Sequence, residues 1–494
     1  MRPATIPDTI KGLQIFLVGA KGTGMTALAE ILVAKGAIVS GSDVDEVFYT
    51  DRILAAIGVK VGMGFDASAL PTSCDLVIHS AAYSPEKNAQ LVEAHRRMLP
   101  VLTYPEALGE LSKKHDSSGI AGVHGKTTTT ALAGSIALAL GLPATIIAGS
   151  AVTGFGGRST LIAGERFLIA ETCEYRRHFL HFAPKRIVLT SIESDHQDYY
   201  PTYGDIYRAF QEYIDLLPKG GSLVYCADDE GARAAALEAG TRRPDLELLP
   251  YGEQATGPFR LFRYSSGSGT TKFELDGFEG QFKLRVPGKH VALDAVGAFA
   301  LCASLCTSAG TSVSPALSPA QVDAARKAIL NFSGTARRSE ILGEAEGILF
   351  MDDYGHHPTA IRKTISGIRD FWPERRVVVD FMSHTYSRTK ALLSEFAACL
   401  DAADEVIIHR IYSSAREAPD PEISGEILAE AIKSRANRAR HGGRVRFFPE
   451  PLQALPTLMA SLHSGDLFLT MGAGDNWRLG RSLIDAFGEE KRSS

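Results

Sequence analysis

Two glycine-rich turns constrain the fold of this chain more than any other feature of its sequence. The first, GAKGTGM at residues 19–25, follows the apolar run LQIFLV and precedes a helix-like run. The second, GVHGKTT at residues 122–128, also follows a short apolar run and precedes an uncharged helix-like run. A strand that passes through a tight glycine turn into a helix is the repeating unit of parallel α/β sheets. The sequence therefore predicts at least two such units.

Length and strand pattern extend this organisation to three α/β units. The chain has 494 residues, and one domain takes roughly 150. Further apolar runs continue the second unit (RFLIAE, RIVLTSI, SLVYCADD), which also carries a β-rich insert near residues 259–286. Others form a third unit (ILFMDDY, RVVVDFM, EVIIHRI, DLFLTMGAG). We expect domains at residues 1–115, 116–336 and 337–494.

Composition excludes several classes of protein. The net charge of -5 comes without a basic block, which argues against nucleic-acid binding. The six cysteines are scattered, which favours a reducing compartment, and the polar N-terminus lacks the apolar core of a signal peptide. We therefore expect a cytoplasmic protein. The uncharged stretch 127–157 could be scored as a membrane span, but Gly141 and Pro143 divide it into a helix and a strand.

The first turn predicts a site for a diphosphate. Successive backbone N–H groups and the N-terminus of the following helix can face a pyrophosphate there. Asp43 ends the next strand, where a dinucleotide fold places the acid that binds a ribose. That position would favour NAD and a dehydrogenase, although the glycine spacing is G-x-x-G-x-G. A purely structural turn is the other alternative.

The second turn predicts an ATP site. A loop of N–H donors wraps phosphates, the Lys126 ammonium adds positive charge, and the Thr127 hydroxyl can bind magnesium. Two residues separate the glycines, where the standard P-loop has four. Further candidate ligands follow the next strands, namely Glu171, Glu174, Glu193, Asp195 and His196. Each acid alone could be a solvated loop residue, but ligands bind at this edge of open α/β sheets.

At this point the sequence resembles the Mur ligase family over essentially the whole chain. The shortened loop GVHGKTTT looks like that family's P-loop, and DDYGHHPT at 352–359 is the most specific of several further matches. The other matches are SGSD at 40–43, HSAA at 79–82, IESDH at 192–196, YSRT at 386–389 and MGAGD at 471–475. The resemblance implies an α/β protein of three domains: an N-terminal Rossmann-like parallel sheet that binds a UDP substrate, a central P-loop ATPase-like domain, and a C-terminal Rossmann-like domain that binds an amino acid.

The resemblance also implies roles for individual residues. The catalytic residues would be Lys126, Glu174, His196 and His356, and the ligands of two magnesium ions would be Thr127, Glu174 and His196. ATP would be bound by Gly122, Val123, His124, Gly125, Lys126, Thr127, Thr128, His290, Asp294, Arg337, Arg338 and Asp353. The UDP substrate would be bound by Gly19, Gly22, Thr23, Gly24, Met25, Asp43, Ser80 and Ala81. The amino acid would be bound by Tyr354, His356, His384 and Arg388.

Three departures from the family pattern affect these roles. Val291 and Asp294 stand where two amide side chains are usual, which changes the expected adenine contacts. Thr385 replaces an arginine, and threonine cannot make the bidentate bonds of a guanidinium to a carboxylate. The family's D-E-S-D run appears here as CEYR at 173–176, which keeps Glu174.

The resemblance implies ATP-dependent joining of L-alanine to UDP-N-acetylmuramate through an acyl phosphate, in peptidoglycan precursor synthesis. Glycine, serine or a recycled peptide are alternative partners for the same UDP-sugar. A UDP-sugar-binding protein that uses ATP only as a conformational switch is an alternative of another class. We expect no membrane insertion, and a monomer or a weak homodimer.

Overall fold

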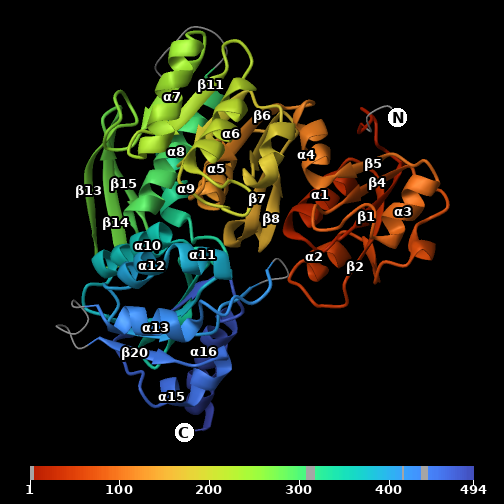
Figure 1. The fold of residues 1–494 in the computed structure, drawn as a ribbon. Helices are drawn as coiled ribbons and strands as arrows, with labels where there is room; N and C mark the ends of the chain where they lie inside the picture. The colour runs from red at the N-terminus through yellow and green to blue at the C-terminus, as the bar shows by residue number, and fades with distance from the viewer. Residues whose placement is uncertain (1–4, 308–316, 414–416, 436–442, 494) are drawn as a thin grey trace. The chain divides into compact units, whose positions relative to one another are not determined.

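The computed structural model describes residues 5–307, 317–413, 417–435 and 443–493. The chain forms two compact units. The first comprises residues 1–261, 275–278 and 293–329, and the second comprises residues 262–274, 279–292 and 330–494. Four β-sheets carry the described part of the chain (Figure 1).

The N-terminal sheet is parallel, with strand order β3-β2-β1-β4-β5. Its strands are β1 (Gln14–Val18), β2 (Ile38–Asp43), β3 (Lys60–Met63), β4 (Leu76–His79) and β5 (Val101–Thr103), and its helices are α1 (Thr23–Ala34), α2 (Asp51–Ala56), α3 (Ala89–Arg96) and α4 (Tyr104–Ser112), with a 3-10 turn η1 (Ala67–Ala69). Successive residues of β1 point to opposite faces, so Leu17 packs in the cluster that contains α1, while Phe16 packs with α3. Both faces are therefore covered, as a parallel sheet requires.

The central sheet has the order β12-β11-β10-β6-β9-β7-β8, and only the pair β7–β8 is antiparallel among its paired strands. Its strands are β6 (Asp116–Ala121), β7 (Ala144–Val152), β8 (Arg158–Ile162), β9 (Phe167–Glu171), β10 (Arg186–Leu189), β11 (Ser222–Cys226) and β12 (Glu247–Tyr251). Its helices are α5 (Lys126–Ala139), α6 (Tyr203–Asp215) and α7 (Glu230–Arg242), with 3-10 segments η2 (Thr153–Phe155) and η3 (Tyr175–His181). Since β9 and β10 flank β6, the segments that follow these three strands meet at one edge.

A small sheet and two helices follow along the chain. The sheet contains β13 (Leu261–Gly267), β14 (Thr270–Leu275) and β15 (Phe278–Leu284), and the helices are α8 (Lys289–Cys306) and α9 (Pro319–Asn331). The predicted β-rich insert is therefore confirmed. Helix α8 is long and apolar enough to cross a bilayer, yet 78% of it is buried inside the protein, as in a core helix.

The C-terminal sheet has the order β16-β17-β21-β18-β19-β20, with β16 antiparallel to β17 and the other pairs parallel. Its strands are β16 (Glu340–Ala345), β17 (Ile348–Asp353), β18 (Arg376–Met382), β19 (Glu405–Ile408), β20 (Arg444–Phe447) and β21 (Asp466–Gly472). Its helices are α10 (Pro358–Phe371), α11 (Tyr386–Ala391), α12 (Leu393–Cys399), α13 (Gly425–Lys433), α15 (Leu455–Met459) and α16 (Trp477–Ser493), with a 3-10 segment η5 (Pro451–Ala454). One apolar cluster packs α10, α12 and α13 on the sheet, and a second packs α15 and α16.

The expected α/β class with parallel sheets is confirmed. The uncharged stretch after Thr127 forms helix α5 and strand β7, as the break at Gly141 and Pro143 predicts. The domain limits near residues 115 and 336 stay a prediction.

Candidate active site

The first glycine turn lies at the point where the strand order of the N-terminal sheet reverses. It connects β1 to α1, and the chain then runs outward through β2, while β4 lies on the other side of β1. Gly19 has a φ of 82°, a conformation that favours glycine. A Cβ on Gly19 would lie 3.0 Å from the Cβ of Ser80, which follows β4. The turn and the segment Ser80–Ala81 therefore share the crevice where open α/β sheets bind ligands.

Asp43 holds the turn together. Its carboxylate accepts the backbone N–H of Lys21 at 2.6 Å and that of Val44 at 2.8 Å. The buried Lys21 ammonium donates to the carbonyls of Val44 and Glu46, and the Thr50 hydroxyl donates to the Lys21 carbonyl. The loop after β2 is thus fastened to the glycine turn through a lysine that the sequence analysis did not select.

Two tyrosines also line this turn, and glycine makes room for both. A Cβ on Gly24 would lie 2.7 Å from the Tyr104 ring, and one on Gly19 would collide with the Tyr83 ring. The Tyr83 hydroxyl donates to Asp43 at 3.4 Å, and burial together with the Asp43 charge raises the pKa of Tyr83 to about 12. The close approach of glycine to an aromatic ring could not be read from a single sequence.

The remaining residues expected at the UDP site lie on both sides of this turn. Gly22 caps α1, and Thr23 accepts a hydrogen bond from the Tyr49 hydroxyl at 3.1 Å. The Met25 side chain is buried in the core, so only its backbone can reach a ligand. Ala81 is exposed.

The second turn has the geometry of a phosphate-binding loop. Gly122 and Gly125 have φ values of 141° and 82°, and Gly125 caps α5. The residues after β10 hold the loop from the neighbouring strand, because the backbone N–H groups of Val123 and His124 donate to Ser191 at 3.0 and 2.9 Å. The sequence analysis missed this supporting serine.

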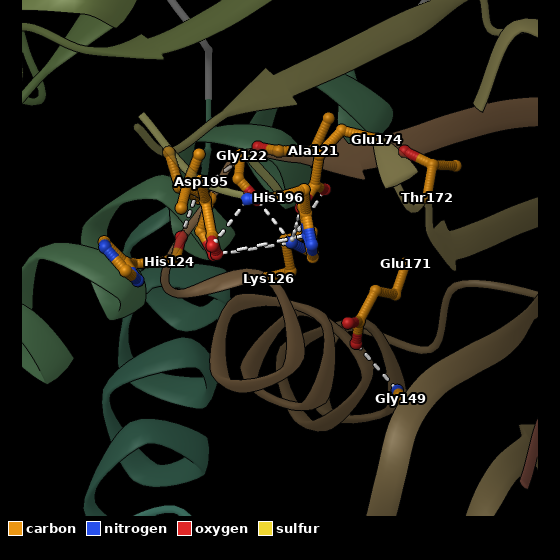
Figure 2. A network of polar contacts seen from close by, with 12 residues as sticks. Ala121, Gly122, His124, Lys126, Gly149, Glu171, Thr172, Glu174, Asp195 and His196 are labelled. Carbon is orange, nitrogen blue, oxygen red and sulfur yellow. Dashed lines mark hydrogen bonds and ion pairs between the residues drawn. The ribbon is translucent and has the colours of Figure 1, made fainter. Parts of the chain in front are cut away.

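Lys126, Glu174 and His196 form the centre of the site (Figure 2). The Lys126 ammonium lies 2.9 Å from Glu174 Oε2, and His196 Nε2 lies 3.2 Å from Glu174 Oε1. Burial alone would raise the pKa of Glu174, but Lys126 and His196 hold it below its usual value. Burial alone would lower the pKa of Lys126, but Glu174 raises it. Both groups are therefore charged at neutral pH.

The other acids that follow β9 and β10 have separate partners. Glu171 turns away from the centre and accepts the backbone N–H of Gly149 at 2.7 Å (Figure 2). Glu193 contacts His124 Nε2 at 3.1 Å. Asp195 accepts the backbone N–H of His196 at 2.7 Å, and so it orients that residue.

The threonines and Asp294 complete the environment of the loop. Thr127 is buried and Thr128 is half-buried at the start of α5. A Cβ on Gly125 would overlap the Asp294 carboxylate, so Asp294 lies directly against the loop. His290 precedes Asp294 by one turn of α8, and its ring lies against Gly288, where an added Cβ would collide with it.

The second unit also carries Arg337, Arg338 and Asp353, which are expected to bind ATP. The Arg337 guanidinium bonds the Asp352 carboxylate at 3.0 Å and the Gly472 carbonyl at 2.7 Å. Asp353 accepts the backbone N–H groups of Ser339 at 2.7 Å and Gly355 at 2.6 Å, and burial raises its pKa. The guanidiniums of both Arg337 and Arg338 lie 5.1 Å from the centre of the Tyr354 ring.

The four residues expected at the amino-acid site come together at the carboxyl edge of the C-terminal sheet. The rings of His356 and Tyr354 lie 5.2 Å apart, and those of His356 and His384 lie 5.8 Å apart. Arg388 Nη1 lies 3.2 Å from His384 Nδ1. His384 also stacks on Tyr412 at 6.1 Å, and the sequence analysis did not select this tyrosine.

The donors around Lys126 suit a magnesium-bound phosphate. Glu174 and Thr127 offer the oxygen ligands that Mg²⁺ prefers, and Glu174 is buried and ionised. His196 offers a nitrogen, which is a softer donor, and its bond to Glu174 orients that carboxylate. The oxygen donors of Glu174 and Thr127 therefore fit one magnesium ion. His196 would either bind a second ion or orient the Glu174 carboxylate.

Comparison with known proteins identifies the family of the chain. Three family profiles match in succession: "Mur ligase family, catalytic domain" at residues 14–116, "Mur ligase middle domain" at 120–302, and "Mur ligase, glutamate ligase domain" at 337–474. A UDP-N-acetylmuramate–L-alanine ligase of Treponema pallidum is 52% identical, over 99% of this chain and 100% of that protein. The ligase of the same name from Desulfitobacterium hafniense is 37% identical, over 96% and 99%.

A solved structure has a fold similar to that of this chain. The crystal structure of a UDP-N-acetylmuramate-alanine ligase from Thermotoga maritima has a TM-score of 0.75 and 24% identity, and the match covers 97% of this chain and 100% of that one. The resemblance that the motifs indicated is confirmed, and the chain belongs to the Mur ligase family of enzymes.

Proposed function

We propose that this chain joins L-alanine to the lactyl carboxylate of UDP-N-acetylmuramate, with ATP hydrolysed to ADP and phosphate. The observation that carries the proposal is the contact of the P-loop Lys126 with the buried Glu174, which His196 also binds. That arrangement suits transfer of a phosphoryl group, and the relatives that cover the whole chain are named for this reaction.

The first step makes the carboxylate reactive. A carboxylate is a poor electrophile, and transfer of the terminal phosphoryl group of ATP converts it into an acyl phosphate. The Lys126 ammonium stabilises the negative charge that moves between oxygens, and the N–H groups of the loop position the phosphates. Magnesium, when bound, would neutralise phosphate oxygens, with Thr127 and Glu174 as its ligands and His196 at a second ion.

In the second step, the neutral amine of the amino acid attacks the acyl carbon, the C–N bond forms and phosphate leaves. A group must therefore accept a proton from the amine. The backbone carbonyl of Tyr354 lies 2.9 Å from His356 Nδ1, so Nδ1 carries the proton and the lone pair of the neutral ring is on Nε2. Arg388 can only donate, so His384 Nδ1 accepts from it and the proton of His384 is on Nε2. His356 is therefore the better proton acceptor, and His384 serves to hold Arg388.

Arg388 is the group best suited to bind the carboxylate of the amino acid. It is 6% exposed, so its charge acts in a poorly hydrated pocket. Thr385 cannot supply a second guanidinium. A single carboxylate-binding arginine leaves glycine and serine as competitors of L-alanine.

The test is mass spectrometry of the products formed from UDP-N-acetylmuramate, ATP and magnesium with an equal mixture of L-alanine, glycine, L-serine and a tripeptide. The proposal expects the alanine adduct to dominate. A dominant tripeptide adduct would identify a recycling ligase, and phosphate release without any adduct would favour a nucleotide-driven switch.

Several further expectations accompany this function. We propose that residues 1–115 bind the UDP substrate, 116–336 bind ATP and 337–494 bind the amino acid, with two magnesium ions in the reaction. A cytoplasmic enzyme has access to ATP and to both other substrates. A monomer or weak homodimer remains our expectation, and sedimentation tests it.

A further inference from the structure

Asp380, His409 and Asn476 form a charged network inside the C-terminal unit. All three side chains are fully buried. His409 Nε2 lies 2.6 Å from Asp380 Oδ1, and the Asn476 amide donates to Asp380 Oδ2 at 2.8 Å. The other ring nitrogen of His409, Nδ1, lies 2.8 Å from the Phe448 carbonyl. Buried charges are costly unless they are paired, so a network without water contact calls for an explanation.

The hydrogen bonds decide the protonation state of His409. Both ring nitrogens face acceptors, a carboxylate and a carbonyl, and only an imidazolium can donate from both. Burial alone would lower the pKa of His409, but the Asp380 charge raises it above its ordinary value of 6.5. The network is therefore a buried ion pair with an amide on its second carboxylate oxygen.

The network joins the ends of three neighbouring strands. Asp380 lies near the end of β18, His409 directly follows β19, and Asn476 follows the loop after β21. The Asn476 amide also donates to the Met471 carbonyl at 3.1 Å and to the Asp380 carbonyl at 3.2 Å, which ties the end of β21 to β18.

The first of these strand ends leads to His384 and Arg388 of the amino-acid pocket, and the second leads to Tyr412, on which His384 stacks. Four residues after Asp380 comes His384, and three after His409 comes Tyr412. The Tyr412 N–H donates to the Ser383 carbonyl at 2.9 Å, and the Thr385 N–H donates to the Tyr412 carbonyl at 3.0 Å. These two hydrogen bonds join the loop after β18 to the loop after β19, directly beyond the buried network.

The loop after β21 packs on the same segment. A Cβ on Gly474 would lie 2.9 Å from Met382 Cγ and 3.3 Å from Tyr412 Cβ. The position of this loop therefore depends on both neighbouring strand ends, which the network holds.

We propose that Asp380, His409 and Asn476 are positioning residues that fix the loops after β18, β19 and β21 around His384 and Arg388. They thereby set the affinity for the amino acid and leave phosphoryl transfer unchanged. This inference rests on the proposed function for the identity of the ligand. A buried ion pair contributes little to stability compared with well-packed apolar residues, whereas its directional bonds specify one arrangement of the segments it joins.

The test uses a variant that removes both charges together. Asp380→Val with His409→Leu replaces the pair by apolar side chains, a change that folded proteins tolerate because no unpaired charge remains. Single variants would leave a buried charge and could fail to fold. The control is Lys433→Ala with Glu430→Ala, which removes a solvent-exposed ion pair on helix α13 of the same unit and leaves no buried charge unpaired.

Three readouts separate a positioning role from a merely structural one. They are the KM for L-alanine, the isotope exchange between ATP and ADP that UDP-N-acetylmuramate supports without any amino acid, and hydrogen exchange of the amides of Thr385 and Tyr412. The double variant is expected to raise the KM by about tenfold or more, since a displacement of ~1 Å can cost about 10²-fold. Faster amide exchange is expected at both positions, with the isotope exchange within about twofold of wild type.

The inference is overturned if the double variant keeps the wild-type KM, or if its isotope exchange falls as much as its ligation rate. It is also overturned if the control variant raises the KM equally. The proposed function fails in a different way, through absence of amino-acid adducts from the wild-type protein, and the amide exchange still tests the network in that case.

Discussion

The Lys126 ammonium and the Glu174 carboxylate lie 2.9 Å apart, and Glu174 is only 2% exposed on its side chain. In an ATP-using enzyme these two groups face opposite partners during the reaction, because the lysine attracts phosphate oxygens and the carboxylate attracts a metal. Their contact shows that one charge balances the other at the centre of the site.

Lys126→Ala should lower phosphate release by at least about 10²–10³-fold, the usual effect of removing one group that stabilises a developing charge. Glu174→Gln keeps the shape and should reduce activity with an increased requirement for magnesium. Steady-state phosphate release over a range of magnesium concentrations measures both. Lys113→Ala, which removes an exposed pair with Glu110, serves as the control and should behave as wild type. Near-normal turnover of Lys126→Ala would contradict the assignment of the P-loop.

Gly125→Ala should weaken ATP binding by at least about tenfold, which corresponds to ~1.4 kcal/mol. Gly125 has a φ of 82°, and its missing side chain makes room for Asp294. Gly141→Ala is the matched control, because Gly141 has a φ of 66° with no atom near its absent Cβ. Both variants carry the same kind of backbone strain, about 1–2 kcal/mol. Calorimetric titration with a non-hydrolysable ATP analogue should show a loss of affinity for Gly125→Ala alone. Equal affinities of the two variants would contradict the role of this loop in ATP binding.

His356→Gln and His384→Gln should differ in the step that they impair. Loss of a general base costs about 10²–10⁴-fold, so His356→Gln should slow amide formation by that factor. It should not change isotope exchange between ATP and ADP in the absence of amino acid. His384→Gln should mainly raise the KM for L-alanine, because His384 accepts a hydrogen bond from Arg388. The reverse pattern would move the proton-accepting role to His384.

The sequence analysis brought the candidate ATP-site residues together because their signals are local. A glycine loop with Lys126 is contiguous, and the rule that parallel strands end at one edge brought Glu174 and His196 to it, as the structure confirms. The same rule could not tell which acid faces inward. Glu171 ends β9 as expected, yet its carboxylate turns to accept the backbone N–H of Gly149 on the neighbouring strand β7.

The charged network of the C-terminal unit could not be found from the sequence. Asp380 and His409 are separated by 29 positions and Asp380 and Asn476 by 96, and each resembles an ordinary polar residue at the end of an apolar run. Only the order of the strands makes them neighbours, since β21 is inserted between β17 and β18. Similarly, Asp43 was selected as a ribose-binding acid from its position at the end of a strand, and Asp353 from the family resemblance. The Asp43 carboxylate accepts the backbone N–H of Lys21, and the Asp353 carboxylate accepts those of Ser339 and Gly355. Their roles toward a ribose stay a prediction.

The His409 network should make stability depend on pH in a defined direction. The pKa of His409 is raised in the folded protein, so its contribution to stability is complete below pH 6.5, its ordinary pKa, and is lost as the pH rises through the folded pKa. One proton gives a slope of up to ~1.4 kcal/mol per pH unit. The charged groups that act on the ring are Asp380 and Asp475, and Arg410 lies 3.9 Å from Asp475 and 2.7 Å from Glu450.

Tryptophan fluorescence can follow this dependence. The chain has two tryptophans, Trp372 and Trp477, both in the second unit, and Trp477 directly follows Asn476. Urea unfolding between pH 6 and 10 should show that the free energy of unfolding of the wild type, relative to Asp380→Val with His409→Leu, is highest near pH 6 and falls with rising pH. Subtracting the free energy of unfolding of the variant from that of the wild type removes the contribution of all titrating groups that the two proteins share. A difference that rises with pH would mean that His409 is neutral in the folded protein, and the assignment of a buried imidazolium would then be wrong.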